Sequence, residues 1–324
     1  MKKRNGGRVY RNIFVLFAVF VVVLCVSFFS CGKDGDAADH PALRAPLQGG
    51  EFGDALTSAI ESEAPKPPAG YVFAEIPNGR IYTGALLLVN FENEYRFTED
   101  DFTVFYKNKP DSYKINGTAL SVATEAFGHF NDYMNAFYRE TGHIDVLVIE
   151  GMRTYEEQRK ILDARIAVCG EAEALKYVAL PGYSEHHTGL AVDIRYDREE
   201  GAYSWINEHM HEYGFILRYP ADKEEITKIA YEYWHYRYVG VPHAQIMREG
   251  NYCLEEYIDT LRGYTVECPF EFETKDGKLY SIYYAAADGE GATVVCVPEN
   301  KDYVISGNNV DGFVITVTGE NEYA

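Results

Sequence analysis

Two segments of this 324-residue chain constrain its fold more than any other feature. Residues 184–193 are Ser-Glu-His-His-Thr-Gly-Leu-Ala-Val-Asp, and residues 232–235 are Glu-Tyr-Trp-His. Two imidazoles and one carboxylate from these segments can supply three ligands to one metal ion, so the fold must bring the segments together. Three nitrogen or oxygen ligands with an open fourth position are typical of catalytic zinc, whereas structural zinc is usually closed by four ligands. Glu232 would remain free to act as a base.

The composition argues against nucleic acid as a partner and does not determine whether the cysteines form disulfides. A formal charge of -20 argues against nucleic acid, because phosphate neutralisation needs clustered Lys and Arg. An acidic surface is sufficient to explain solubility and identifies no substrate. No cysteine pair has the Cys-x-x-Cys spacing of a zinc site, so we expect buried or paired structural cysteines at Cys169, Cys253, Cys268 and Cys296.

The N-terminal residues 1–31 predict export. Basic residues precede an uninterrupted apolar run at 13–29, the pattern of an export signal. The run is near the lower limit for spanning a bilayer, so a cleaved signal and a retained anchor both remain possible. Residues 28–32 resemble a bacterial lipoprotein cleavage box, which adds lipidation of Cys31 as a third possibility. Each alternative places the body of the protein outside the cytoplasm, with the membrane as a partner through the N-terminal segment.

Three further regions follow this signal. Residues 32–77 contain several prolines and few large apolar groups, which predicts a spacer. Residues 78–262 contain alternating helical and strand patterns and should form the main domain. Beyond residue 263 the pattern changes to short strand-like runs, which predicts a small all-β appendage whose simplest role is to cap the domain. The strand-like runs are 279–284, 293–297, 303–306 and 313–317.

Within the main domain, apolar spacing predicts an α+β fold. A helix over 118–141 should end at Gly142, and a second should begin at a capping box formed by Thr154 and Glu157 and end near 168. We expect helices packed on a small, mainly antiparallel sheet that carries the metal site. The other expected strands are 86–90, 146–149, 190–196, 215–218 and 234–239, and the other expected helices are 204–213, 243–249 and 254–262.

Three blocks of the main domain resemble the VanY-type D-alanyl-D-alanine carboxypeptidases, metallopeptidases that trim the stem peptides of bacterial peptidoglycan. The blocks are residues 150–154 (Glu-Gly-Met-Arg-Thr) with Gln158, residues 182–193, which begin Gly-Tyr-Ser-Glu-His, and residues 234–240 (Trp-His-Tyr-Arg-Tyr-Val-Gly). Their order and spacing fit together, so chance agreement is improbable. The chain departs from the family pattern at Tyr233, where the family commonly has Pro, and this change removes no ligand.

The resemblance implies His186, Asp193 and His235 as the ligands of one zinc ion. Gly189 permits the turn that would bring the first two toward the same ion. The family usually has Gln where this chain has His187. On an extended segment neighbouring side chains point in opposite directions, so we do not expect His187 to bind the ion.

The resemblance also implies a catalytic carboxylate and a cation. Glu232 would take the proton of the attacking water and deliver it to the leaving amine, and Arg153 would stabilise charge on the scissile carbonyl. Candidates for contacts with the substrate peptide are Tyr183, Ser184 and Gln158.

The implied function is that of an exported zinc carboxypeptidase that removes the C-terminal D-alanine from peptidoglycan stem peptides, bound to the cell membrane and facing the wall. One alternative is an LD-carboxypeptidase that cuts tetrapeptide stems with the same mechanism. An alternative of another class is a non-enzymatic wall-binding module with a structural zinc. The free carboxylate of Glu232 argues against the last alternative, because a structural site has no use for it.

Overall fold

The computed structural model describes residues 66–97, 101–196, 201–289 and 291–319. The chain divides into the units Met1–Ser62 and Glu63–Ala324, and every described residue belongs to the second unit. The expected export signal, the lipidation candidate Cys31 and most of the expected spacer lie outside the described residues. Within the described residues, no helix has the length and apolar character needed to cross a membrane.

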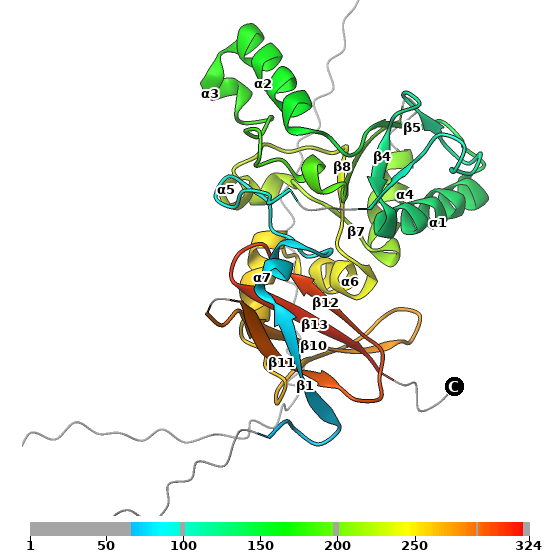
Figure 1. Cartoon of the computed structure of the whole chain (residues 1–324). Helices are drawn as coiled ribbons and strands as arrows, with labels where there is room; N and C mark the ends of the chain where they lie inside the picture. Colours follow the sequence, from blue (N-terminus) through cyan, green and yellow to red (C-terminus); the bar gives the residue numbers. More distant parts are fainter. Residues whose placement is uncertain (1–65, 98–100, 197–200, 290, 320–324) are drawn as a thin grey trace, which may run out of the picture. The chain divides into compact units, whose positions relative to one another are not determined.

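A five-stranded sheet forms the centre of the main domain. Its strands lie in the order β3 (Lys114–Ile115), β5 (Val146–Glu150), β6 (Ala191–Tyr196), β8 (His235–Tyr238) and β7 (Phe215–Leu217). Only β3 and β5 run parallel, and all other neighbours are antiparallel. The predicted α+β fold, with helices beside a small and mainly antiparallel sheet, is therefore confirmed (Figure 1).

Helix α1 (Thr124–Thr141) packs its apolar face against this sheet. It begins later than the predicted range 118–141, because β4 (Ser121–Ala123) precedes it and pairs with β2 (Phe102–Val104). It ends as predicted at Gly142, which adopts the left-handed conformation with φ 71°. The buried core that joins helix and sheet includes Phe130, Tyr133, Met134, Phe137, Val148 and Val192.

The other helices follow the sequence prediction closely. Helix α2 (Tyr155–Cys169) begins with the predicted capping box, in which the side chains of Thr154 and Glu157 each bind the other residue's backbone N–H. Helices α6 (Val241–Gly250) and α7 (Leu254–Leu261) lie where two short helices were expected. The remaining helical segments are α3 (Glu171–Ala174), α4 (Gly201–His209), α5 (Glu224–Thr227) and the 3₁₀ helices η1 (Asn78–Tyr82), η2 (Glu185–Thr188), η3 (Met210–Tyr213) and η4 (Ala221–Lys223).

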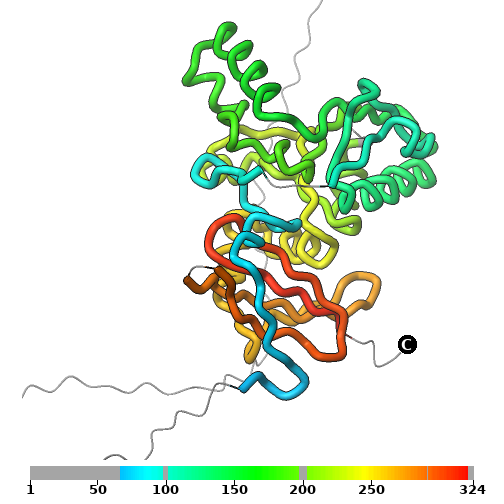
Figure 2. Tube along the Cα trace, viewed as in Figure 1, coloured from blue at the N-terminus to red at the C-terminus, as the bar shows by residue number. Residues whose placement is uncertain are grey.

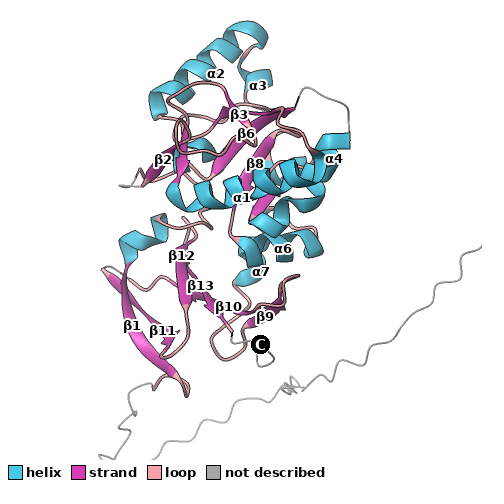
Figure 3. Cartoon of the chain, turned by 90° about the vertical axis from the view of Figure 1, so that its right-hand side faces the viewer, coloured by secondary structure: helices cyan, strands magenta, loops and turns pink. Residues whose placement is uncertain are grey.

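The C-terminal region is a four-stranded sheet with a two-stranded sheet beside it. The larger sheet has the order β12 (Tyr303–Gly307), β13 (Gly312–Thr318), β10 (Leu279–Ala286), β9 (Phe270–Glu273). In the smaller sheet β1 (Tyr71–Pro77) pairs with β11 (Ala292–Pro298) (Figures 2 and 3). The expected spacer 32–77 therefore differs from the structure at its end, because residues 71–77 find a strand partner near the C-terminus that local composition does not reveal.

The C-terminal sheet shares a hydrophobic core with the main domain. Ile282 of β10 and Val314 of β13 pack in one buried cluster with Val239, Leu254 and Ile258. The C-terminal strands therefore form the predicted small all-β region, and this region packs into the same buried core as the main domain.

The segment 86–90 is buried, but it is not the strand that its apolar sequence predicts. Its backbone groups bond to side chains and to a loop: Arg237 donates to the carbonyl of Leu87 (2.9 Å) and Asn309 to that of Leu88 (3.0 Å). The N–H of Leu88 donates to the carbonyl of Asn308 (3.1 Å). Because these partners satisfy the buried backbone, no neighbouring strand is required.

The four cysteines of the described residues are free thiols. Cys253 is buried, and Cys169 and Cys268 are exposed. The sequence allowed disulfides between these four cysteines, and the described residues contain none.

Candidate metal centre

Strand register brings the two predicted segments together. Asp193 on β6 lies directly opposite His235 on β8 and, on its other side, opposite Glu150 on β5. His186 lies in η2, just before β6, and Gly189 ends η2 in the left-handed conformation with φ 68°. The turn at Gly189 returns the chain so that His186 faces Asp193.

Three donor atoms from these residues form one compact group. His186 Nε2 lies 3.4 Å from Asp193 Oδ2, and His235 Nδ1 lies 3.0 Å from Asp193 Oδ1. The possible ligand atoms of all three residues lie within 4.8 Å of one another, and all three side chains are buried. No other cluster of this kind occurs among the described residues.

The surroundings of this group fit a bound cation. The Nδ1 atom of His186 lies 2.7 Å from the carbonyl oxygen of Gly151, which leaves Nε2 as the available lone pair. Asp193 Oδ1 is buried and receives no well-directed hydrogen bond from the part of the chain that the structure describes. Two imidazole nitrogens and one carboxylate oxygen are donors that suit zinc.

The electrostatics of the site also favour positive charge at its centre. Burial opposes the ionised form of Asp193, but the neighbouring histidines hold its pKa well below the usual range. Burial likewise opposes protonation of His235, but the nearby carboxylates of Asp193, Glu185 and Glu232 raise its pKa to about 9. A divalent cation would supply the positive charge that these carboxylates attract.

Glu232 lies beside the ligand group without belonging to it. Its Oε2 atom lies 3.6 Å from His235 Nδ1, and its side chain is buried. Burial is the largest cause that raises the pKa of Glu232, to about 7, while His235 and Arg153 act in the opposite direction. A carboxylate with this pKa can both accept and release a proton near neutral pH.

Arg153 extends from the turn between β5 and α2 into the same cavity. Its guanidinium donates from NH1 to Gln158 Oε1 (2.7 Å), and NH2 lies 3.4 Å from Glu150 Oε2. Its Nε atom is buried and has no hydrogen-bond partner among the described residues. Gln158 also donates to the carbonyl of Ala179 (2.7 Å), so both ends of its amide are occupied and it holds Arg153 in place.

A cavity of about 470 Å³ surrounds the metal group and contains most of the predicted residues. Ser184 lines it, together with Tyr219, Trp234 and residues of α2. Tyr183 instead lines a neighbouring cavity of about 280 Å³ and ends a turn in which its N–H donates to the carbonyl of Leu180 (2.9 Å). The structure therefore separates Tyr183 from the other candidate substrate contacts.

Both ring nitrogens of His187 contact backbone groups around the site. Its Nε2 atom accepts from the N–H of Gly182 (3.0 Å), and its Nδ1 lies 2.7 Å from the carbonyl of Arg153. It does not join the ligand group, as expected, although the segment is a 3₁₀ helix and not extended. The two histidines point apart because successive residues of a helix lie on different faces.

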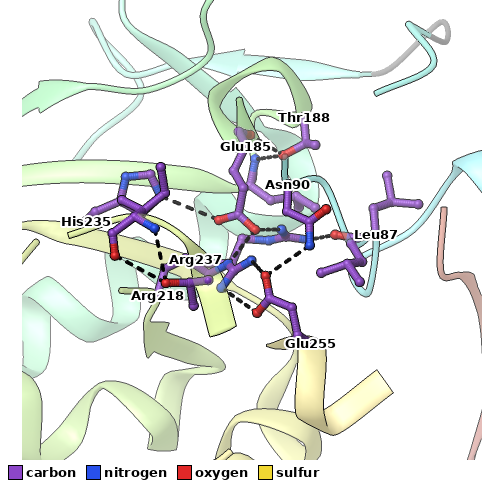
Figure 4. A network of polar contacts seen from close by, with 12 residues as sticks. Leu87, Asn90, Glu185, Thr188, Arg218, His235, Arg237 and Glu255 are labelled. Carbon is purple, nitrogen blue, oxygen red and sulfur yellow. Dashed lines mark hydrogen bonds and ion pairs between the residues drawn. The ribbon is translucent and has the colours of Figure 1, made fainter. Parts of the chain in front are cut away.

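The sequence interpretation missed Glu185. This residue is buried beside His235 and contacts Arg218, which follows β7, and Arg237, which lies within β8 (Figure 4). Its position directly before His186 was the only local signal. A buried ion pair between distant segments has no spacing rule from which it could be predicted.

Comparison with known proteins identifies relatives of the chain. A family model described as VanY, D-alanyl-D-alanine carboxypeptidase, matches residues 120–241. A D-alanyl-D-alanine carboxypeptidase of Enterococcus faecium is 36% identical over 253 residues, which cover 75% of this chain and 78% of that protein. The bifunctional D-Ala-D-Ala dipeptidase and carboxypeptidase VanXYC of Enterococcus gallinarum is 43% identical over 129 residues, covering 36% and 68%.

One solved structure resembles most of the described unit. The vancomycin resistance D,D-dipeptidase VanXYg, crystallised with a D-Ala-D-Ala phosphinate analogue, superposes with a TM-score of 0.68 and 33% sequence identity. The match covers 77% of this chain and 99% of that one.

Proposed function

Because this chain belongs to the VanY family of D-alanyl-D-alanine carboxypeptidases, we propose that it is a zinc-dependent enzyme that removes the C-terminal D-alanine from peptidoglycan stem pentapeptides. The family assignment makes it a carboxypeptidase that acts on peptidoglycan peptides. The observation that carries the finer proposal is one cavity lined by the ligand group, Glu232 and Arg153.

The proposed metal ligands are His186 through Nε2, Asp193 through its carboxylate and His235 through Nδ1. A zinc ion in this position supplies Lewis acidity and makes a water molecule a stronger acid. Two neutral imidazoles and one carboxylate leave a coordination position open, which suits catalysis better than a structural role.

Glu232 is the proposed general base and acid. Its carboxylate accepts a proton from the attacking water as the water oxygen bonds to the scissile carbonyl carbon. It then delivers that proton to the nitrogen of the leaving D-alanine as the C–N bond breaks. Burial raises the pKa of Glu232 to about 7, and this value, together with the 3.6 Å distance from its Oε2 to His235 Nδ1, supports a residue that changes protonation state during turnover.

Arg153 is the proposed cation for the carbonyl oxygen. Negative charge develops on this oxygen as the carbonyl carbon becomes tetrahedral, and a fixed positive charge in a buried site stabilises it strongly. The hydrogen bond that Arg153 donates to Gln158 and its contact with Glu150 hold the guanidinium in place before substrate binds, which lowers the reorganisation needed during the reaction.

The proposed location is outside the cytoplasm, on the membrane and facing the cell wall. The basic residues and apolar run of residues 1–31 support it, because this pattern directs export. Protease treatment of intact spheroplasts should digest the protein. Replacement of Cys31 by Ser should release it from the membrane if a lipid is the anchor, and should leave it bound if the apolar run is the anchor.

The bond that the enzyme prefers is tested by substrate choice. We expect D-alanine release from a stem pentapeptide at a much higher kcat/KM than from the matched tetrapeptide or from free D-Ala-D-Ala. Preference for the tetrapeptide would replace this proposal by an LD-carboxypeptidase. Preference for the free dipeptide would indicate a dipeptidase, an activity named for two of the relatives.

A further inference from the structure

Four charged side chains form one cluster beside His235 and have no part in the mechanism above. They are Glu185, Arg218, Arg237 and Glu255. The side chains of Glu185, Arg218 and Arg237 are 0% exposed, and that of Glu255 is 12% exposed. Burying ionised groups is costly, and a hydrophobic cluster of similar volume is often at least as stabilising. The cluster therefore calls for an explanation other than stability.

The carboxylate of Glu185 faces two ways (Figure 4). Its Oε1 atom accepts from Arg218 Nε (2.8 Å) and from Arg237 NH1 (2.5 Å). Its Oε2 atom receives no hydrogen bond within the cluster and lies 3.5 Å from His235 Nε2. One oxygen is thus fixed by the two arginines, and the other faces the imidazole of a proposed ligand.

The chemistry of His235 requires such a partner. Its Nδ1 atom faces Asp193, so a metal bound there leaves the ring proton on Nε2. This Nε2 atom is buried and has no hydrogen-bond partner among the described residues. The carboxylate oxygen of Glu185 is the acceptor that faces it, and a small rotation of the ring or the carboxylate would complete the bond.

The cluster is itself held by backbone from a distant part of the chain. Arg237 NH2 donates to the carbonyls of Ala85 and Leu87 (2.9 Å each), and Asn90 donates to Glu255 (3.1 Å). Glu255 in turn forms a two-pronged ion pair with Arg218 (2.9 and 2.7 Å). Arg237, held by these two carbonyls, leaves the carboxylate of Glu185 little freedom to move away from His235, whereas Glu255 reaches Glu185 only through Arg218.

We propose that Glu185 is a positioning residue, whose carboxylate is fixed by Arg218 and Arg237 and orients the imidazole of His235 so that Nδ1 faces the metal. This inference rests on the proposed function only in that it requires a divalent ion at His235. Partners of this kind in other metal sites typically contribute about 10- to 100-fold in metal affinity.

The test compares two substitutions that remove the same charge from the same cluster. Glu185→Gln removes the carboxylate that faces His235, whereas Glu255→Gln removes the other carboxylate, which has no contact with His235. The full chain in detergent is stripped of metal, and its zinc Kd is measured by competition with a chromophoric chelator. We expect Kd to rise about 10- to 100-fold for Glu185→Gln and less than about 3-fold for Glu255→Gln.

A second readout reports the geometry at the metal directly. The visible absorption spectrum of the Co²⁺-loaded protein should change in Glu185→Gln and stay as in the wild type in Glu255→Gln, because only the first substitution frees the ring of His235. Equal losses of zinc affinity and equal spectra in the two variants would overturn the proposal, because both would then act through stability alone.

Glu185→Gln leaves Arg218 and Arg237 with only one carboxylate in the cluster, that of Glu255, and this loss of charge could prevent folding. A third variant provides a test that does not depend on this outcome. Glu185→Asp keeps the charge of the cluster but withdraws the carboxylate from His235. We expect this variant to fold and to bind zinc more weakly than the wild type, and wild-type affinity would contradict the proposal. Failure of the wild-type protein to bind zinc at all would instead refute the proposed function, so the two outcomes are distinct.

Discussion

At the scale of single residues, two neighbouring histidines provide a direct test of the ligand set. His186 faces Asp193, whereas both ring nitrogens of His187 lie against the backbone at Gly182 and Arg153. His186→Ala should lower zinc affinity by more than the roughly 100-fold upper range for loss of an outer partner, because it removes a ligand. His187→Ala should retain one zinc per chain and lose only stability. Zinc content after dialysis, measured by atomic emission, checks both, and zinc loss in His187→Ala alone would exclude this ligand set.

The second test at this scale concerns the proposed base. Glu232→Gln keeps the size of the side chain but cannot accept a proton, so kcat should fall by about 10²- to 10⁴-fold. Zinc content should be unchanged, because Glu232 lies beside the ligand group and not within it. Steady-state release of D-alanine gives the rate. A variant with near-wild-type kcat would show that another group moves the proton.

At the scale of elements, the turn that ends η2 should tolerate no side chain. Gly189 adopts φ 68°, and a Cβ atom there would lie 2.6 Å from Phe102 and 2.8 Å from the backbone nitrogen of Ala123. Gly142 adopts φ 71° at the end of α1, and no atom of the described residues lies within 4 Å of the same position. Gly142→Ala should therefore lower the free energy of unfolding by only about 1 kcal/mol, the cost of placing alanine in the left-handed conformation. Gly189→Ala should lower it by more and should also weaken zinc binding.

Urea unfolding and zinc titration of the two glycine variants distinguish these effects. The left-handed backbone is common to both, so any excess destabilisation in Gly189→Ala measures the overlap with Phe102 and β4. Equal unfolding free energies for the two variants would mean that the surroundings of Gly189 adjust freely and do not hold the turn between His186 and Asp193.

Local signals predicted most elements, and long-range contacts explain the exceptions. The capping box at Thr154 and the glycine after α1 act through neighbouring backbone groups, so the sequence contains the whole of their cause. Strand β1 exists because β11 pairs with it, and segment 86–90 is irregular because distant side chains bind its carbonyls. Neither partner is visible in the local pattern.

The same distinction applies to the site. His186, Asp193 and His235 were predicted from a resemblance in spacing, and the structure brings their donor atoms together. The motif does not show that Tyr183 and Ser184 line different cavities, because this depends on the folded backbone around them. Glu185 was missed because its partners Arg218 and Arg237 come from distant parts of the sequence, and only the folded chain shows that all three are buried together.

At the scale of the whole described unit, a buried histidine joins the main domain to the C-terminal sheet. His243 on α6 lies 2.7 Å from the hydroxyl of Tyr257 on α7 and 3.0 Å from that of Thr316 on β13. Burial lowers the pKa of His243 to about 3. The ring is therefore neutral in the folded protein throughout the mildly acidic range, where an exposed histidine would be charged.

This histidine should make stability depend on pH. An unfolded chain protonates His243 near pH 6.5, and the folded chain does so only near pH 3, so the unfolded state binds the extra proton between these values. The contribution of His243 to the free energy of unfolding should be constant above pH 6.5. Below pH 6.5 it should fall by about 1.4 kcal/mol per pH unit. Urea unfolding of metal-free protein between pH 7 and 4 provides the measurement.

The variant His243→Gln isolates the contribution of this group. It should be less stable at pH 7, because Tyr257 and Thr316 lose a well-placed partner. Below pH 6.5, however, its free energy of unfolding should fall less steeply with decreasing pH than that of the wild type, by about 1.4 kcal/mol per pH unit. Parallel pH dependences in the variant and the wild type would show that His243 is not neutral in the fold.

The most direct test of the central claim is the release of D-alanine from a stem pentapeptide, followed with and without a chelator. The proposed zinc carboxypeptidase predicts release that stops when metal is removed and returns when one equivalent of zinc is restored. Release that continues unchanged in metal-free protein, or no release by protein shown to hold zinc at His186, Asp193 and His235, would contradict it.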